Sequence, residues 1–307
     1  MHDVVDLRSD TLTLPTPAMR EAMARAEVGD DVWEEDPTVR RLEEQAARRM
    51  AKEAALFVSS GTQGNLTSVL AQTHPGQEII LDADSHIFNY EGASSAMFGG
   101  VQTLALQTER GFPSPAQVRE HIRPSNIHIA MTGLVCLENT HNRHGGTCCT
   151  PEEIEAVAAA AHAGGVPVHL DGARLFNAAV ALGRPVADFA RPVDSLTFCL
   201  SKGLGAPVGS LVCGSRDFIA RARRVRKLLG GACARSGCSP RPVSWLSTPW
   251  STVSRKTTRM RGAWPRAWRG CRGVRLDLDK VQTNIVIFHV DRAEAPVSSS
   301  PAVWRAR

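Results

Sequence analysis

Short apolar runs alternate with longer amphipathic segments between Thr16 and Leu229. Apolar runs of strand length predict strands at Ala54–Val58, Glu78–Leu81, Val101–Leu106, Ile127–Leu137, Val166–Leu170, Ser195–Leu200 and Gly209–Cys213. Segments with apolar residues at helical spacing predict helices after Thr16 and Asp36, and near Thr62–Gln72, Pro115–Ile122, Pro151–Ala163 and Asp217–Leu229. Because the two kinds of element take turns and the strands are polar only at their ends, we predict an α/β fold. It is a three-layer αβα sandwich with a mostly parallel sheet covered on both faces.

Two of the helices have a clear start in the sequence. Thr16-Pro17 and Asp36-Pro37 each place a capping side chain before a proline in the first helical turn. Gly29 is expected to end the first of these helices, and the second is expected to reach Lys52.

The pattern breaks near residue 232. Between Ala232 and Arg272 the chain has eight arginines, one lysine, no acidic residue and no apolar periodicity. A strand pattern returns at Thr283–Val290. We therefore predict a major domain over residues 1–231, an aberrant basic segment over 232–272, and the remnant of a small, incomplete C-terminal α+β domain over 273–307.

The composition is that of an ordinary globular protein: of 307 residues, 43% are hydrophobic and 22% charged. The N-terminal residues are acidic without an apolar run, and no segment approaches the roughly 18 apolar residues of a membrane span. The eight cysteines include no Cys-x-x-Cys pair, and the adjacent Cys148-Cys149 has no further ligand at metal-binding spacing. We expect a cytoplasmic protein with reduced thiols, no membrane partner and no metal site.

The candidate chemistry centres on a lysine that follows an apolar run. Lys202 comes just after the strand predicted at Ser195–Leu200, whereas Asp171 and Arg174 follow the strand predicted at Val166–Leu170. Together they supply an amine that can form an imine, a carboxylate that can hold a pyridinium proton, and a guanidinium. The chemistry of pyridoxal 5'-phosphate (PLP) requires these groups, so the major domain over residues 1–231 is predicted to be PLP-binding. Since ligands bind beyond the carboxyl ends of parallel strands, we expect a PLP site at that edge of the sheet.

Each further candidate also has an ordinary structural interpretation. The loop Ser59–Asn65 and the hydroxyl of Ser201 suit a phosphate, yet glycine-rich turns between strand and helix are common without one. Arg174 suits a substrate carboxylate or a structural salt bridge. His86 is suited to stack on a planar ring or to act as a base, and a capping or core histidine is the structural alternative. His128 begins an apolar run, which favours a core histidine.

Taken together, the motifs resemble those of the low-specificity L-threonine aldolases, which are fold type I PLP enzymes. The resembling stretches are Asp6–Thr11, Glu27–Asp31, Glu35–Pro37, Ser60–Asn65, Asp84–Phe88, Glu138–Asn142, His169–Asn177, Leu200–Leu204 and Ala206–Ser210. They are spread over residues 3–231, with a further island at Gly273–Asp291.

The resemblance implies how a cofactor is held. Lys202 matches the lysine that binds PLP, Asp171 matches the partner of the pyridinium nitrogen, and His86 matches the imidazole stacked on the ring. Gly61 and Thr62 match contacts to the phosphate.

The resemblance also implies a substrate and a reaction. Ser9 and Arg174 match groups that receive the substrate carboxylate, and His128 and Tyr90 match positions near the substrate side chain. The implied reaction is retro-aldol cleavage of a small amino-acid substrate, L-threonine or L-allo-threonine, to glycine and acetaldehyde. His86, His128 or a water between them is the implied base, and a homodimer or homotetramer is the implied assembly.

The chain departs from the family pattern after Gly231, where the expected long helix and a late arginine are missing. We hypothesise that residues 232–272 and the end of the chain are translated in a shifted reading frame, which is restored near Gly273. An aldolase-like sequence in another frame of the coding DNA is the test. An inactive PLP-binding relative and another fold type I lyase stay open as alternatives. Nucleic-acid binding through the basic, tryptophan-rich segment is a further alternative, which salt-dependent binding to a polynucleotide would support. Because the segment resembles no nucleic-acid module, we expect no nucleic-acid partner.

Overall fold

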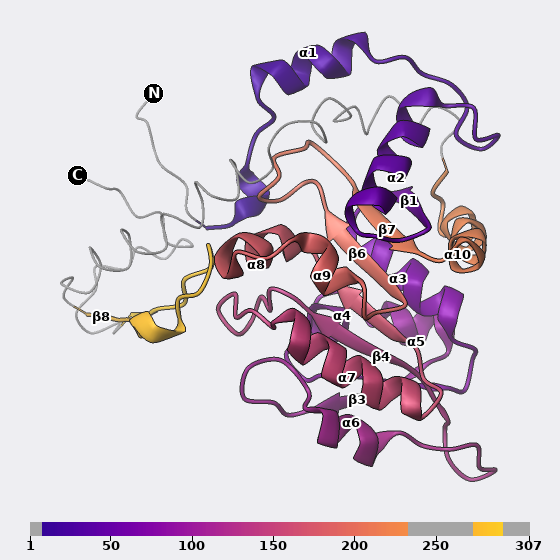
Figure 1. Ribbon diagram of the computed structural model, residues 1–307, viewed down its shortest axis with the longest axis vertical. Coiled ribbons are helices and arrows are strands. Elements are labelled where there is room, and N and C mark those ends of the chain that lie inside the picture. The colour runs from indigo at the N-terminus through magenta and orange to yellow at the C-terminus, as the bar shows by residue number, and fades with distance from the viewer. Residues whose placement is uncertain (1–7, 233–272, 291–307) are drawn as a thin grey trace.

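The computed structural model describes residues 8–232 and 273–290, and a seven-stranded sheet forms the centre of the described part (Figure 1). The strands are β1 Ala54–Val58, β2 Glu78–Asp82, β3 Gln102–Leu106, β4 Thr132–Glu138, β5 Val168–Asp171, β6 Ser195–Cys199 and β7 Ser210–Gly214. Their order across the sheet is β1-β7-β6-β5-β4-β2-β3. Within this sheet β7 pairs antiparallel with both neighbours and the remaining pairs are parallel, which confirms the predicted α/β fold with a mostly parallel sheet.

Helices cover both faces of the sheet (Figure 1). The helices are η1 Asp10–Leu12, α1 Pro17–Arg25, α2 Pro37–Arg49, α3 Gly61–Gln72, α4 His86–Asn89, α5 Ser94–Gly99, α6 Pro115–His121, α7 Pro151–Ala163, α8 Leu175–Leu182, α9 Val186–Ala190, α10 Arg216–Leu228 and η3 Leu278–Lys280. The predicted caps are present: the Thr16 side chain accepts the N–H of Met19, and the Asp36 carboxylate accepts those of Thr38 and Val39.

Alternate residues of each strand enter different cores. In β1, Phe57 belongs to the large core on the α2 and α7 side, whereas Leu56 and Val58 pack with α10 on the other side. The same alternation places Ile80 of β2 in the large core and Ile79 in the core under α3. A sheet that is buried on both faces explains why the predicted strands read as continuous apolar runs.

Two predicted strands differ from the structure. The strand predicted from Ile127 starts at Thr132, because the Asn126 side chain accepts the backbone N–H of His128 and holds the preceding residues in a turn. The strand predicted at Thr283–Val290 was wrong over most of its length. The structure has a strand, β9, at His289–Val290 alone, paired with β8 at Val274–Arg275.

Helix ends and short helices were also predicted imperfectly. Helix α1 ends at Arg25, before Gly29, because the Gly29 N–H donates to the Asp36 carboxylate that caps the next helix. Helices α4, α5, α8 and α9 were not predicted; the first two and α9 are of six residues or fewer. Apart from Ala232, the predicted basic segment 232–272 lies outside the described residues, as do residues 291–307. No helix among the described residues has the length and apolar character needed to cross a bilayer.

Candidate active site

The carboxyl ends of the parallel strands gather the candidate residues at one edge of the sheet. Strand β5 ends at Asp171, and β6 ends three residues before Lys202. Asp171 pairs in register with Thr197 of the neighbouring β6, so both residues belong to the same edge. Strand β1 leads into the N-terminus of α3, and β2 leads into α4, which begins at His86.

Asp171 is a buried carboxylate with neutral hydrogen-bond donors. Its Oδ1 accepts the backbone N–H of Ala173 at 3.0 Å, and its Oδ2 accepts Nδ2 of Asn65 at 2.8 Å. The residue is 3% exposed, and within the described chain it forms no salt bridge. Because a buried charge is costly without a counter-charge, this carboxylate is suited to a cationic partner from a ligand.

Asn65 connects Asp171 to a wider buried network. Its Nδ2 also donates to Oε1 of Glu91 at 2.8 Å, and its Oδ1 lies 3.2 Å from Nε2 of His169. Nδ1 of His169 lies 2.9 Å from Oγ of Ser195. Burial lowers the pKa of His169 to about 4, so this histidine is neutral at physiological pH.

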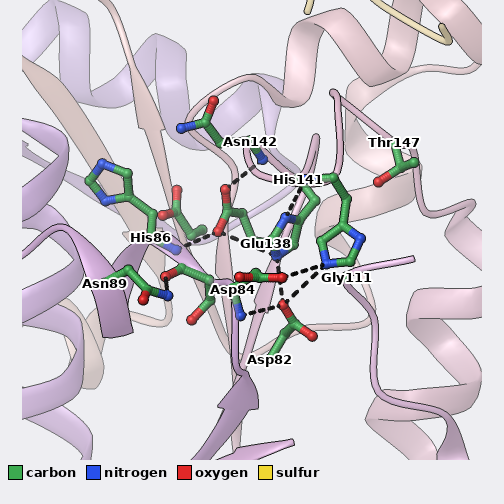
Figure 2. A network of polar contacts seen from close by, with 12 residues as sticks. Asp82, Asp84, His86, Asn89, Gly111, Glu138, His141, Asn142 and Thr147 are labelled. Atoms are coloured by element: carbon green, nitrogen blue, oxygen red, sulfur yellow. Dashed lines mark hydrogen bonds and ion pairs between the residues drawn. The ribbon is translucent and has the colours of Figure 1, made fainter. Parts of the chain in front are cut away.

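His86 lies between the acidic and basic groups of the site. Its Nδ1 is 2.8 Å from Oε1 of the buried Glu91, and this hydrogen bond raises the pKa of His86 above its ordinary value. The negative charge of Asp171 raises that pKa further, whereas burial and the positive charge of Lys202 oppose the rise. The charges of Asp171 and Lys202 therefore both act on the His86 imidazole. The backbone N–H of His86 donates to Oε2 of Glu138 at 2.7 Å (Figure 2).

Lys202 is half-buried in the loop after β6. Its backbone carbonyl accepts the Oγ1–H of Thr13 at 2.6 Å and the N–H of Gly205 at 2.8 Å, which holds the loop against the N-terminal segment. Ser201, the residue before it, is also half-buried.

Arg174 pairs with Asp10. Its Nε and Nη2 each donate to the Asp10 carboxylate at 2.8 Å, and both side chains are 8% exposed. The structural salt bridge that the sequence left open is thus present, and the Asp10 carboxylate engages Nε and Nη2 of the guanidinium. Ser9 precedes Asp10 and is exposed, and its Oγ accepts the N–H of Thr11.

Gly61 and Thr62 form the first turn of α3. The first N–H groups of a helix have no partner within the helix and favour an anion. A Cβ at Gly61 would lie 2.8 Å from Sγ of Cys199 at the end of β6, so the backbone approaches this strand closely. Tyr90 is half exposed beside His86, with 5.6 Å between the ring centroids.

The structure does not bring His128 to this edge within one chain. His128 is exposed and precedes β4, whereas the edge of the sheet that holds Asp171 receives the other end of β4 at Glu138. Its interpretation as a core histidine was wrong. The flanking Ile127 is 95% exposed, so the apolar residues at this point belong to a surface loop and not to a buried strand.

Several residues of the site were missed from the sequence. Asp10 and Asn65 lie inside the resembling stretches, and only their contacts in the fold single them out: Asp10 pairs with Arg174, and the buried Asn65 donates to Asp171. Glu91 and Glu138 are buried acids that contact His86 from different elements. A carboxylate five residues after His86 was the available signal for Glu91, and a polar residue ending an apolar run was the signal for Glu138.

Known proteins share both the sequence and the fold. The beta-eliminating lyase family matches residues 6–291 of this chain. Low-specificity L-threonine aldolase 1 of Arabidopsis thaliana is 44% identical over 294 residues, which cover 94% of this chain and 81% of that protein. The low specificity L-threonine aldolase of Escherichia coli K12 is 43% identical over 235 residues, or 76% of this chain and 70% of that protein.

A solved structure of Leishmania major threonine aldolase has a similar fold. It superposes with a TM-score of 0.75 at 23% identity and covers 87% of this chain and 80% of that one.

Proposed function

Because the chain belongs to the beta-eliminating lyase family, and within it to the low-specificity L-threonine aldolases, we propose that it uses PLP to cleave L-threonine and L-allo-threonine to glycine and acetaldehyde. The observation that carries the proposal is the buried Asp171 carboxylate beside His86 and near Lys202, with no counter-charge bound to it in the described chain.

The described residues fit PLP in the chemistry of their donors. The cofactor brings an aldehyde for an amine, a ring nitrogen for a carboxylate and a phosphate for N–H groups. Lys202 would hold the aldehyde carbon, and Asp171 would hold the ring nitrogen. Gly61, Thr62 and Ser201 would hold the phosphate at the α3 N-terminus. The hydroxyl of the buried Ser210 contacts the Cys199 thiol, lies 3.8 Å from the position of a Cβ on Gly61, and is a further donor at this turn.

Bound PLP supplies a ring that accepts the electron pair released when a bond to the substrate Cα breaks. The protein directs which bond breaks. Arg174, through Nη1, and Ser9 receive the substrate carboxylate and thereby orient the bond between Cα and Cβ. Asp171 keeps a proton on the ring nitrogen, and Asn65 keeps Asp171 in place.

His86 is the proposed base for the substrate hydroxyl. Its Nδ1 is engaged with Glu91, which leaves Nε2 to take the proton directly or through a water. His128 is the other proposed base, and it can reach a site only from a neighbouring copy of the chain. A homodimer or homotetramer, and a cytoplasmic location, are parts of the same proposal.

The test uses the purified full chain with PLP and L-threonine or L-allo-threonine. We expect release of glycine and acetaldehyde, and a visible absorbance of lysine-bound cofactor that borohydride removes. Lys202→Ala should abolish that absorbance and lower the rate by several orders of magnitude, whereas Lys280→Ala, at an exposed lysine, should retain both. Absorbance that persists in Lys202→Ala contradicts the assignment.

The products separate the alternatives. Release of ammonia and a keto acid instead of glycine indicates a different lyase of the same fold. Bound cofactor without turnover indicates an inactive relative, which the unusual sequence of residues 232–272 favours.

A further inference from the structure

A second group of convergent side chains lies beside the candidate active site. Asp82 ends β2, and His141 and His144 lie in the turn after β4 (Figure 2 shows Asp82 and His141 facing each other). One donor atom from each of the three residues lies within 4.8 Å of the others. We propose that Asp82, His141 and His144 bind a divalent transition-metal ion of the zinc class, with Asp84 as the fourth ligand.

The separations between donor atoms fit the edges of a tetrahedral site. Nε2 of His141 is 3.1 Å and Nε2 of His144 is 3.7 Å from Oδ1 of Asp82. Nε2 of His144 is also 3.4 Å from Oδ2 of Asp84. Metal–ligand bonds of about 2.0–2.2 Å give a tetrahedron with edges of about 3.3–3.6 Å. Small side-chain movements therefore bring the donors of Asp82, His141 and His144 to bonding distance from one centre, and a rotation of the exposed Asp84 side chain adds the fourth donor.

A proton alone does not account for this convergence. The His141 side chain is 0% exposed and its Nε2 faces Oδ1 of Asp82 at 3.1 Å, whereas Nε2 of His144 lies 3.4 Å from Asp84 and 3.7 Å from Asp82, beyond good hydrogen-bonding distance. One proton can join one imidazole to Asp82, which leaves the second imidazole nitrogen unsatisfied in the same space. A divalent cation satisfies both nitrogens and both carboxylates, and two histidines with two carboxylates suit zinc-class ions.

The contacts around the ligands hold them in orientation. Oδ2 of Asp82 accepts the Oγ1–H of Thr108 at 2.6 Å, and Oδ1 accepts the backbone N–H of Asp84 at 2.9 Å. The ring of His141 packs against Gly111, where a Cβ would lie 2.4 Å from Cδ2 (Figure 2). Such outer contacts orient the ligands of metal sites.

Cation binding requires one local adjustment. The backbone N–H of His144 lies 3.4 Å from Nδ1 of His141. A metal on Nε2 places the ring proton on Nδ1, so this long contact must open. His144 lines a cavity of about 390 Å³, which gives an ion a route to the site.

The proposed ion is a positioning element next to the reaction site. Oε2 of Glu138 is 3.8 Å from Nε2 of His141 and accepts the backbone N–H of His86 at 2.7 Å. A bound ion therefore fixes the turn after β4 against β2, beside the imidazole proposed to act as a base.

The test measures binding to the full chain without PLP, after a chelator has removed metals. Titration with Co²⁺ should give visible absorption bands of a tetrahedral ion that saturate at one ion per chain. Equimolar Zn²⁺ should then bleach these bands and raise the melting temperature. Mg²⁺ should do neither, because it prefers six oxygen ligands.

Variants locate the ion. His144→Gln should weaken Co²⁺ binding at least about 100-fold, and Thr108→Val, which loosens Asp82, about 10–100-fold. Both side chains are partly exposed, so the variants should fold, and His74→Gln, at an exposed histidine elsewhere, should bind as the wild type does. Absence of the bands, or unchanged affinity in His144→Gln, overturns the proposal. The readout is binding alone, so it is independent of whether the chain proves to be an aldolase.

Discussion

At the scale of single residues, the site depends on buried side chains that determine one another's protonation. Because Nδ2 of Asn65 donates to two carboxylates, its Oδ1 faces Nε2 of His169, and this nitrogen must carry the ring proton. Nδ1 of His169 then accepts from Ser195, whose oxygen accepts Nε2–H of Gln72. The chain of bonds fixes one tautomer of His169 and, through Asn65, the position of Asp171.

The neutral state of His169 makes stability depend on pH. Its pKa falls from 6.5 to about 4 on folding, because burial penalises the charged ring. Between these pH values the unfolded chain binds a proton here that the folded chain does not. This contribution to the free energy of unfolding is therefore complete above about pH 6.5 and falls by roughly 3 kcal/mol as the pH drops to about 4.

His169→Gln should remove this part of the pH dependence while keeping a polar side chain between Asn65 and Ser195. Urea unfolding of both proteins near pH 7, 5.5 and 4.5 measures it. The wild type should lose more stability than the variant on acidification. Parallel losses in the two proteins contradict the assignment of a depressed pKa to His169.

At the scale of elements, the close approach of α3 to β6 requires glycine at position 61. Alanine favours a helix by about 1 kcal/mol over glycine. In Gly61→Ala, however, the new methyl would lie 2.8 Å from Sγ of the buried Cys199. We expect the clash to dominate and to destabilise the protein by about 1–3 kcal/mol.

The double variant Gly61→Ala with Cys199→Ala identifies the clash as the cause. Removal of the sulfur should make the glycine substitution neutral or favourable, so the two changes should couple by at least about 1 kcal/mol in urea unfolding. Additive losses would show that Gly61 is needed for another reason.

Helix α10 is tied to the N-terminal segment by a buried ion pair. Nη1 of Arg226 lies 3.0 Å from Oδ2 of Asp31 and donates to the carbonyl of Phe57 at 2.9 Å, and both charged side chains are 2% exposed. Arg226→Met should cost about 3–5 kcal/mol in the free energy of unfolding, because Asp31 stays buried without its counter-charge. Adding Asp31→Asn should recover part of the loss. Arg224→Met, on the exposed side of the same helix, is the control and should change little.

The same elements show what the sequence could predict. Lys202 and Asp171 were found because each follows an apolar run, and the carboxyl ends of parallel strands share an edge. Which strands are neighbours is not written in the local pattern, so the meeting of Asp82 after β2 with His141 after β4 was not predicted. His128 failed as a core residue because the side chain of Asn126 turns the chain where apolar spacing favours a strand.

At the scale of the whole molecule, the short polar run Gln282–Asn284 contacts two regions of the sheet domain. One is the loop that follows the proposed ion ligands, and the other is Asp10 in the candidate active site. Oγ1 of Thr283 donates to the carbonyl of Gly146, and Oε1 of Gln282 accepts the N–H of Cys148 at 2.8 Å. Asn284 accepts from Asn177 and donates to Asp10, the partner of Arg174. These side-chain contacts explain why residues 283–288 are not a strand, and they join the described residues 273–290 to the sheet domain.

Gln282→Ala tests whether this packing persists in solution. The amide of Cys148 loses an acceptor, so its hydrogen exchange should accelerate about tenfold, as expected for the loss of about 1 kcal/mol from one hydrogen bond. Exchange measured by mass spectrometry on a peptide covering residues 141–149 reports it, and Lys280→Ala, two residues away and 81% exposed, is the matched control. Equal exchange in Gln282→Ala and wild type would mean that Gln282 does not contact the amide of Cys148 in solution. The polar run would then not support the Asp10–Arg174 pair.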